Sequence, residues 1–159
     1  MTPAPTPFFS VVPHFRDGAD TSRALLERCL SRLDEFEPRV GAFVHCDSSL
    51  ARRAADASTE RWRDGRPLSP IDGMPVGIKD IIETADMPTG QGSALFTGWE
   101  SGRDAASVAA LREAGAVILG KTVTTEFAAS EPRGTRNPWD PERTPAGRAA
   151  VRPLPSAAA

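Results

Sequence analysis

The stretch from Arg103 to Gly120, RDAASVAALREAGAVILG, decides the fold class of this chain. Its first part, which ends at Ala114, repeats apolar side chains along one helix face. They are Ala105, Val108 and Leu111. Asp104 stands where a helix cap is expected, and Gly115 stands where a glycine commonly follows a helix. The apolar run AVIL then predicts a buried parallel strand directly after the helix, and such an αβ unit is typical of an α/β fold.

The segment from Thr21 to Phe36 predicts an amphipathic helix. Its apolar side chains recur at steps of three and four residues, which gathers them on one face. They are Leu26, Cys29, Leu30, Leu33 and Phe36. Asp20, Thr21 or Ser22 can cap the first turn. Pro38 is expected to end the helix, because proline lacks a backbone N–H.

A short strand and a second helix are predicted next. The sequence VGAFVHC, from Val40 to Cys46, is typical of a strand. Asp47 or Ser48 is expected to cap a helix that runs to about Trp62. The side chains expected on its inward face are Leu50, Ala51, Ala54, Ala55 and Ser58.

One strand region lies between two loops in the middle of the chain. Residues 63–70 are rich in glycine, proline and charge, and Asp72-Gly73 marks a turn. From Pro75 to Ile82, glycine alternates with branched apolar residues, which predicts a strand close to the core. Glycine and serine dominate residues 88–102, so a loop packed over another part of the molecule is expected there.

Proline is concentrated at both ends of the chain. Four of the fifteen prolines lie in the first thirteen residues, and six lie between residues 132 and 155. Because proline disrupts hydrogen-bonded structure, both ends are expected to resist regular structure. The sequence therefore predicts an N-terminal extension (1–20), a folded region (21–145) and a disordered tail (146–159).

Composition and charge narrow the classes of function. The net charge of -2 disfavours nucleic acid or an anionic membrane surface as a partner. No apolar run is long enough to span a membrane, and the N-terminus lacks a basic signal region, so a cytoplasmic protein is expected. Cys29 and Cys46 are expected to be reduced. His14 and His45 have no metal-ligand spacing with a cysteine, so no metal site and no histidine-based triad are expected.

Three segments, in this order, resemble the amidase-signature family. They are GMPVGIKDII (Gly73 to Ile82), RDAASVAALREAGAVILGKTVTTEFA (Arg103 to Ala128) and TRNPWDPERTP (Thr135 to Pro145). Members of this family are serine hydrolases that cleave amide bonds with a Ser–cis-Ser–Lys triad. The resemblance covers the chain from about Leu25 to Pro145. It implies the incomplete N-terminal part of an α/β fold with a mixed sheet covered by helices, a small-molecule amide as substrate of the intact enzyme, and no cofactor.

Lys79 falls on the lysine of the family's G-(I/V)-K-D motif, and the resemblance implies that it is the catalytic lysine. Its neighbours Ile78, Ile81 and Ile82 are expected to desolvate the amine partly, which disfavours the charged form. A neutral amine can accept a proton, by way of a bridging serine, from a nucleophilic serine. From the residues alone, a surface lysine beside Asp80 is the alternative, since lysines are mostly exposed.

Other polar and aromatic residues lie near the expected site or along the chain. Ser93 and Thr89 belong to the Gly-rich loop, which either approaches the site or is a plain turn. The buried strand is followed by Thr124, Thr125 and Glu126. Binding groups often follow such strands in α/β proteins, but the resemblance implies that these three residues support the site. Lys121 ends the strand and is interpreted as structural. The tryptophans expected to pack or cover surface are Trp62, Trp99 and Trp139.

The chain departs from the family pattern directly after Pro145. There the family continues as GGSSSGSAAAV, and the first serine of that run is the bridging cis-serine. Here the sequence reads AGRAAV, and Arg148 stands in the place of that serine. Arginine stays protonated at ordinary pH and cannot relay a proton. The family's nucleophilic serine lies further downstream in a T-G-G-S stretch, which the sequence, ending at Ala159, does not reach.

A frameshift is our hypothesis for this departure. The tail AGRAAVRPLPSAAA can be back-translated with GC-rich codons. Restoring a single G after the codon of Pro145 then turns the tail into GGSSSGSAAAVGGG, which is the family's loop in register. Codon degeneracy leaves room for a chance match, although the length of the recovered run argues against one. The nucleotide sequence tests this hypothesis, because a frame without a serine-rich loop would contradict it.

Two functional interpretations follow. In the first, which the resemblance implies, the chain is an amidase-family hydrolase of carbon–nitrogen bonds in amides that is truncated and inactive in this form. In the second, it is a non-catalytic fragment or a binding partner. The substrate, the oligomeric state and the choice between a free-standing amidase and part of an amidotransferase stay open. Because the strands of such a fragment lack sheet neighbours, we predict marginal stability and aggregation.

Overall fold

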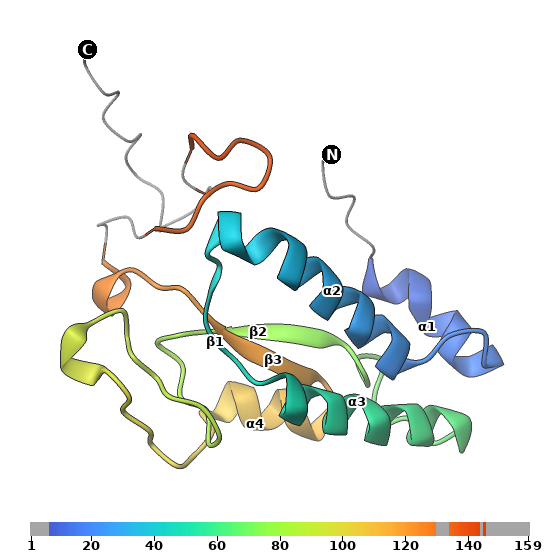
Figure 1. Ribbon diagram of the computed structural model, residues 1–159. Helices are drawn as coiled ribbons and strands as arrows, with labels where there is room; N and C mark the ends of the chain where they lie inside the picture. The colour runs from blue at the N-terminus through green and yellow to red at the C-terminus, as the bar shows by residue number, and fades with distance from the viewer. Residues whose placement is uncertain (1–6, 130–133, 144, 146–159) are drawn as a thin grey trace.

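The computed structural model describes residues 7–129, 134–143 and 145 of the chain. Its elements are α1 (Phe8–Asp17), α2 (Ser22–Val40), β1 (Phe43–Cys46), α3 (Ser48–Arg63), β2 (Pro75–Lys79), the 3-10 helix η1 (Ala94–Phe96), α4 (Ala106–Glu113), β3 (Val117–Thr122) and the 3-10 helix η2 (Glu126–Ala128). The strands form one mixed sheet in the order β1–β3–β2, in which β3 is parallel to β2 and antiparallel to β1 (Figure 1). The α/β fold predicted from the sequence is confirmed.

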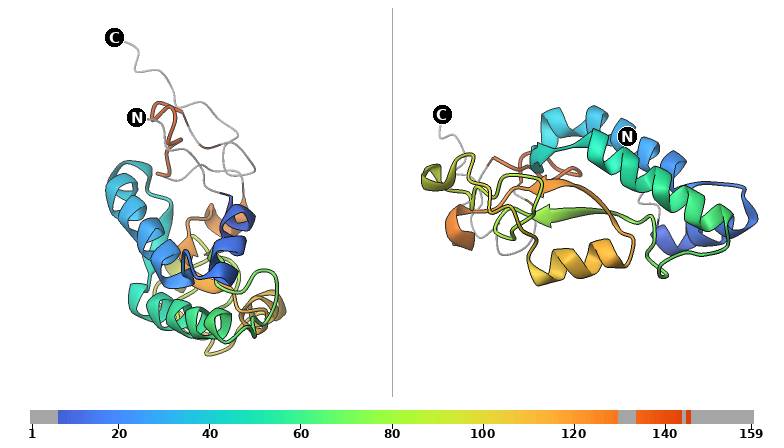
Figure 2. Two further views of the ribbon diagram at one scale, coloured as in Figure 1. Left: turned by 90° about the vertical axis from the view of Figure 1, so that its right-hand side faces the viewer. Right: turned by 90° about the horizontal axis from the view of Figure 1, so that it is seen from below.

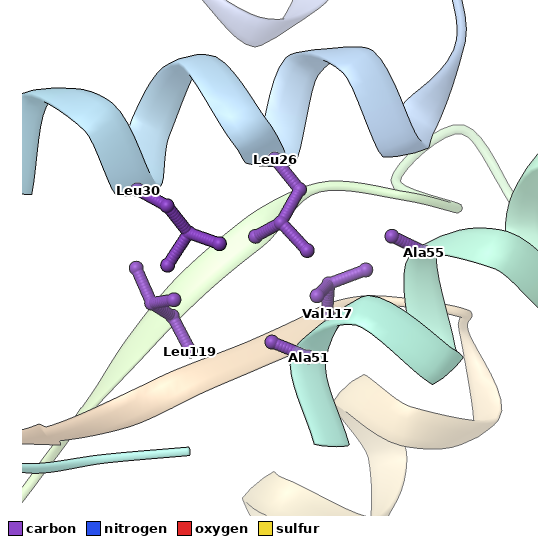
Figure 3. Packing of buried hydrophobic residues seen from close by; sticks show 6 residues of the cluster. All are labelled: Leu26, Leu30, Ala51, Ala55, Val117 and Leu119. Carbon is purple, nitrogen blue, oxygen red and sulfur yellow. The ribbon is translucent and has the colours of Figure 1, made fainter. Parts of the chain in front are cut away.

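Helices α2 and α3 cover one face of the sheet. Their apolar stripes meet over β3, as the close view in Figure 3 shows. The buried side chains of this cluster are Leu26, Leu30, Ala51, Ala55, Val117 and Leu119. Removal of this apolar surface from water is the main force that holds both helices on the sheet.

Helix α4 packs on the opposite face of the sheet from α2 (Figures 1 and 2). Val108 of α4 lies in a buried cluster with Ile78 of β2, Ile118 of β3 and Met87, which belongs to the loop after β2. The predicted αβ unit is therefore present, and Gly115 follows α4 with φ 87°, a conformation that favours glycine. The sheet has helices on both faces, which explains why β3 is buried along almost its whole length.

The helix starts follow the predicted caps in two cases and not in the third. Thr21 Oγ1 accepts a hydrogen bond from the Ala24 N–H at 3.0 Å. Asp47 in the same way caps the first turn of α3. The prediction that Asp104 caps α4 is wrong, because α4 begins one residue later, after Ala105. The Asp104 carboxylate instead pairs with Arg112 at 2.9 Å.

The expectation that residues 1–20 resist regular structure is wrong for residues 8–17. These residues form α1, which contains Pro13. Proline in a helix interior removes one backbone hydrogen bond, but α1 buries Val11, Val12 and Phe15 against Leu25 and Trp62. This burial offsets the lost hydrogen bond. The periodic apolar positions of α1 are therefore a stronger signal than its proline.

Helix α2 also continues past a proline. It was expected to end at Pro38 and instead reaches Val40. Pro38 is exposed and lies in the last turn, so that the missing N–H removes only one hydrogen bond. Gly41 ends the helix in the left-handed conformation, with φ 59°, and its N–H donates to the Glu37 carbonyl.

Strands β1 and β2 are shorter than predicted, and β3 contains a bulge. β1 begins at Phe43 instead of Val40, because α2 extends to Val40 and Gly41 caps it. β2 stops at Lys79, and the residues to Ile82 form a turn. Along β2 and β3, the pair Val76–Ile118 is followed by the pair Gly77–Gly120, so β3 holds one extra residue there. A bulge of this kind changes the face toward which the later residues of the strand point.

Both outer strands pair only with β3 within the part of the chain that the structure describes. Their outer edges therefore carry backbone groups without a strand partner. Among the described residues, no helix is both long enough and apolar enough to cross a membrane.

Candidate active site

Lys79 is the last residue of β2, and its Cα lies opposite that of Thr122 at the end of β3. Its carbonyl accepts the Ile82 N–H at 2.9 Å, which turns the chain away from the sheet immediately. The side chain is half-buried. Its amine has no hydrogen-bond or ion-pair partner among the described residues, and in particular no serine lies within hydrogen-bonding reach of it.

The Lys79 side chain is half-buried, as expected for partial desolvation, but Ile78 and Ile81 do not surround its amine. Ile78 is 5% exposed but belongs to the cluster under α4. Adjacent strand residues point to opposite faces, so Ile78 and Lys79 do not share a face. Ile81 is 38% exposed, because the chain leaves the sheet before it. The amine is therefore only partly shielded from water.

Lys121 is fully buried and makes the polar contacts that Lys79 lacks. Its Nζ donates to Thr89 Oγ1 at 2.6 Å and to the Pro88 carbonyl at 3.0 Å. It also lies 3.2 Å from Asp80 Oδ1. Burial lowers the pKa of Lys121 below its ordinary value, although the Asp80 carboxylate acts in the opposite direction.

Asp80 connects β2, β3 and the Gly-rich loop. Its N–H donates to the Thr122 carbonyl at 3.0 Å, and its carbonyl accepts the Gln91 N–H at 2.9 Å. Its carboxylate accepts the Gly90 N–H at 3.1 and 3.2 Å. A Cβ at Gly90 would lie 3.1 Å from Asp80 Oδ2, so the loop approaches the carboxylate closely because a glycine stands there. Asp80, which directly follows Lys79, is thus held in place by hydrogen bonds of both its backbone and its side chain.

The Gly-rich loop also contacts η2. Ser93 Oγ donates to Glu126 Oε1 at 2.6 Å, and the Phe127 N–H donates to the Gln91 carbonyl at 2.9 Å. Gln91 and Phe127 both have positive φ, 53° and 48°. Non-glycine residues adopt this conformation only where the surroundings impose it. The contacts between the two segments supply that constraint.

An open, mostly apolar pocket of about 640 Å³ lies beside this loop. Its lining includes Asp80, Ser93 and Thr124, together with His45 from the edge strand β1. Lys79 is not among its lining residues. The pocket and the Lys79 amine are therefore separate features of the same end of the sheet.

The structure brings some of the candidate residues together and separates others. Thr89 accepts a hydrogen bond from Lys121, and Ser93 donates one to Glu126, but among the described residues none of these side chains hydrogen-bonds to the Lys79 amine. Thr124 and Thr125 are buried and donate to nearby backbone carbonyls, which agrees with a supporting role. Trp62 is buried and its Nε1 donates to the Asp72 carbonyl, whereas Trp99 and Trp139 are exposed. The sequence reasoning missed the role of Asp80, which was considered only as a neighbour of a surface lysine.

No group of three or more His, Cys, Asp or Glu side chains able to hold a metal ion occurs in the described residues. Arg148 and the rest of residues 146–159 lie outside the described residues. The predictions of a disordered tail and of a lost serine relay therefore stay predictions.

Comparison with known proteins relates most of the chain to one family. Residues 24–149 match the family model described as Amidase. A glutamyl-tRNA(Gln) amidotransferase subunit from Chloroflexus aggregans is 41% identical over 136 residues, which cover 82% of this chain and 28% of the relative. The corresponding chloroplastic/mitochondrial protein from Zea mays is 37% identical over 153 residues, which cover 91% of this chain and 28% of the relative. This chain thus spans about 28% of the length of these curated relatives.

A solved structure shows the same relation in three dimensions. Native peptide amidase from Stenotrophomonas maltophilia matches with a TM-score of 0.80 at 31% identity. The match covers 92% of this chain and 32% of the peptide amidase.

Proposed function

Because this chain belongs to the amidase family, we propose that it is part of a hydrolase of carbon–nitrogen bonds in small amides, with Lys79 as the catalytic lysine. The observation that carries the proposal is the position of Lys79. The lysine of the family motif stands at the carboxyl end of β2, an edge where α/β proteins often bind ligands, and its amine is not engaged by an acidic side chain among the described residues.

The proposed chemistry uses Lys79 as a base. The neutral amine accepts a proton from a bridging serine, which in turn takes the proton of a nucleophilic serine. The nucleophile adds to the amide carbonyl, and collapse of the tetrahedral intermediate expels the nitrogen, which takes up the proton. Water then cleaves the acyl-serine ester through the same relay and releases the acid.

This chain is proposed to be inactive by itself. Arg148 occupies the place of the bridging serine, and its guanidinium stays protonated. A base at Lys79 then has no hydroxyl through which to act.

The test is hydrolysis of a simple aryl amide by the purified chain and by the product of a gene with the frame restored after the Pro145 codon. No turnover above background is expected from the chain. The frame-restored protein is expected to hydrolyse the amide, and Lys79→Ala is expected to lower its kcat by about 10³-fold or more. Turnover by the original chain that is lost on Lys79→Ala would contradict inactivity. Unchanged activity of frame-restored Lys79→Ala would contradict the role of Lys79.

A second candidate function is that of a non-catalytic binding partner. Exposed apolar side chains at the η1–η2 end favour it, since Leu95 is 83% exposed and Phe127 is 52% exposed. The same hydrolysis assay separates the two candidates. A frame-restored protein without amide hydrolysis would favour the binding partner.

A further inference from the structure

The chain contains only two lysines, Lys79 and Lys121, and the structure places both at one end of the sheet. They lie on adjacent strands but in opposite environments. Lys121 is fully buried with three polar partners, whereas the half-buried Lys79 amine has none among the described residues. The proposed function uses Lys79 and leaves the cost of burying Lys121 unexplained.

We propose that Lys121 is a positioning residue, which holds the Asp80 carboxylate away from the Lys79 amine and so keeps that amine available as a base. This inference rests on the proposed function of Lys79. Asp80 is the immediate neighbour of Lys79 along the chain. A carboxylate that reached the amine would favour its charged form, which cannot accept a proton.

The bulge in β3 is what places Lys121 beside Asp80. Without the extra residue, strict alternation would put Lys121 on the same face as Val117 and Leu119, toward α2 and α3. With the bulge, Lys121 pairs with Ile78 and shares the α4 face with it. Asp80 is two residues beyond Ile78, which directs it to that same face.

The contacts of Asp80 also hold its carboxylate on that face. Lys121 Nζ lies 3.2 Å from Oδ1, and the Gly90 N–H donates to both oxygens. Asp80 is 4% exposed, so its carboxylate depends on these partners more than on water. Loss of the Lys121 charge would leave a buried carboxylate without its cation, and the only other lysine of the chain is Lys79.

The experiment measures acetylation of Lys79 in the purified chain by sulfosuccinimidyl acetate at pH 8, followed by peptide mass spectrometry. The neutral amine is the nucleophile, so the rate reports its availability. With two lysines in the chain, each adduct is assigned directly, and Lys79→Arg confirms the assignment. In the unsubstituted chain, Lys79 is expected to react and Lys121 to stay protected.

Lys121→Met is expected to slow acetylation of Lys79 by about tenfold, because an unpaired carboxylate nearby stabilises the charged amine. Asp80→Asn combined with Lys121→Met is expected to restore the original rate, since no carboxylate remains. A merely structural role would loosen the turn and make Lys79 react faster in both variants. Faster or unchanged acetylation in Lys121→Met would therefore overturn the proposal.

If circular dichroism shows that Lys121→Met does not fold, Lys121→Gln replaces it in the acetylation experiment. Glutamine keeps a hydrogen-bond donor without the charge, and the same slowing, reversed by Asp80→Asn, is expected. These rates do not depend on amide hydrolysis. Failure of the proposed function would appear only in the hydrolysis assay, and failure of this inference would appear only in the acetylation rates.

Discussion

At the scale of single residues, the buried carboxylate of Asp72 is held by an arginine side chain and a backbone N–H. Asp72 is fully buried, and its oxygens accept from Arg61 Nε at 2.8 Å and Nη2 at 2.7 Å. The Leu68 N–H donates to it as well. Burial acts to raise the pKa of Asp72, but the Arg61 guanidinium and the Leu68 N–H outweigh burial and hold it below its usual range.

This carboxylate makes stability depend on pH. Because the pKa of Asp72 is lower in the folded state than its ordinary value of 3.8, the stability that it contributes is present above that value and is lost as pH falls through the folded pKa. Asp72→Asn is expected to lower the free energy of unfolding by about 2 kcal/mol at pH 7, and by less at pH 3. Urea unfolding at both pH values checks this.

A matched control for Asp72 is the exposed pair of Asp64 and Arg66. Asp64→Asn is expected to change the free energy of unfolding by less than about 0.5 kcal/mol at either pH. An equal loss for both substitutions would contradict the special role of the buried carboxylate.

At the scale of elements, apolar periodicity was a better guide than proline. Both α1 and α2 contain a proline that was expected to exclude or end a helix. In each case the helix continues, since one lost hydrogen bond costs less than the burial of several apolar side chains gains. Cap residues at Thr21 and Asp47 were predictable because they act on the next few residues only.

Pro13 offers a direct test of this balance. Pro13→Ala is expected to raise the free energy of unfolding by about 1–3 kcal/mol, because alanine restores the backbone N–H at an exposed helix position. Thermal unfolding followed by circular dichroism measures the change. Pro7→Ala, directly before α1, is the control and should have little effect, because Pro7 is outside the helix. A Pro13→Ala chain less stable than the original would show that the proline fits its place in α1.

At the scale of the whole molecule, the chain folds as part of an amidase-family protein. The sheet has two outer edges without a strand partner in the described part of the chain, and apolar side chains are exposed at the η1–η2 end. Such surfaces favour self-association. The chain is therefore predicted to be marginally stable and to aggregate.

Size exclusion with light scattering tests this prediction. The chain is expected to elute as multimers whose size rises with protein concentration, and Leu95→Glu is expected to reduce that rise, since this side chain is 83% exposed and adds no burial cost. Thr97→Glu, a polar and exposed position in the same loop, controls for added charge. A sharp monomer with cooperative unfolding at all concentrations would refute the prediction.

The α/β class, most helix and strand positions, the family resemblance and the candidate lysine are all legible in the amino-acid sequence, because periodicity, caps and motifs act over a few residues. Which side chains meet is known only from the folded chain. The bulge in β3 redirected Lys121 to Asp80, and the turn after β2 exposed Ile81. The physical reason is that strand register and chain reversal depend on contacts between segments about forty residues apart, which local patterns do not encode.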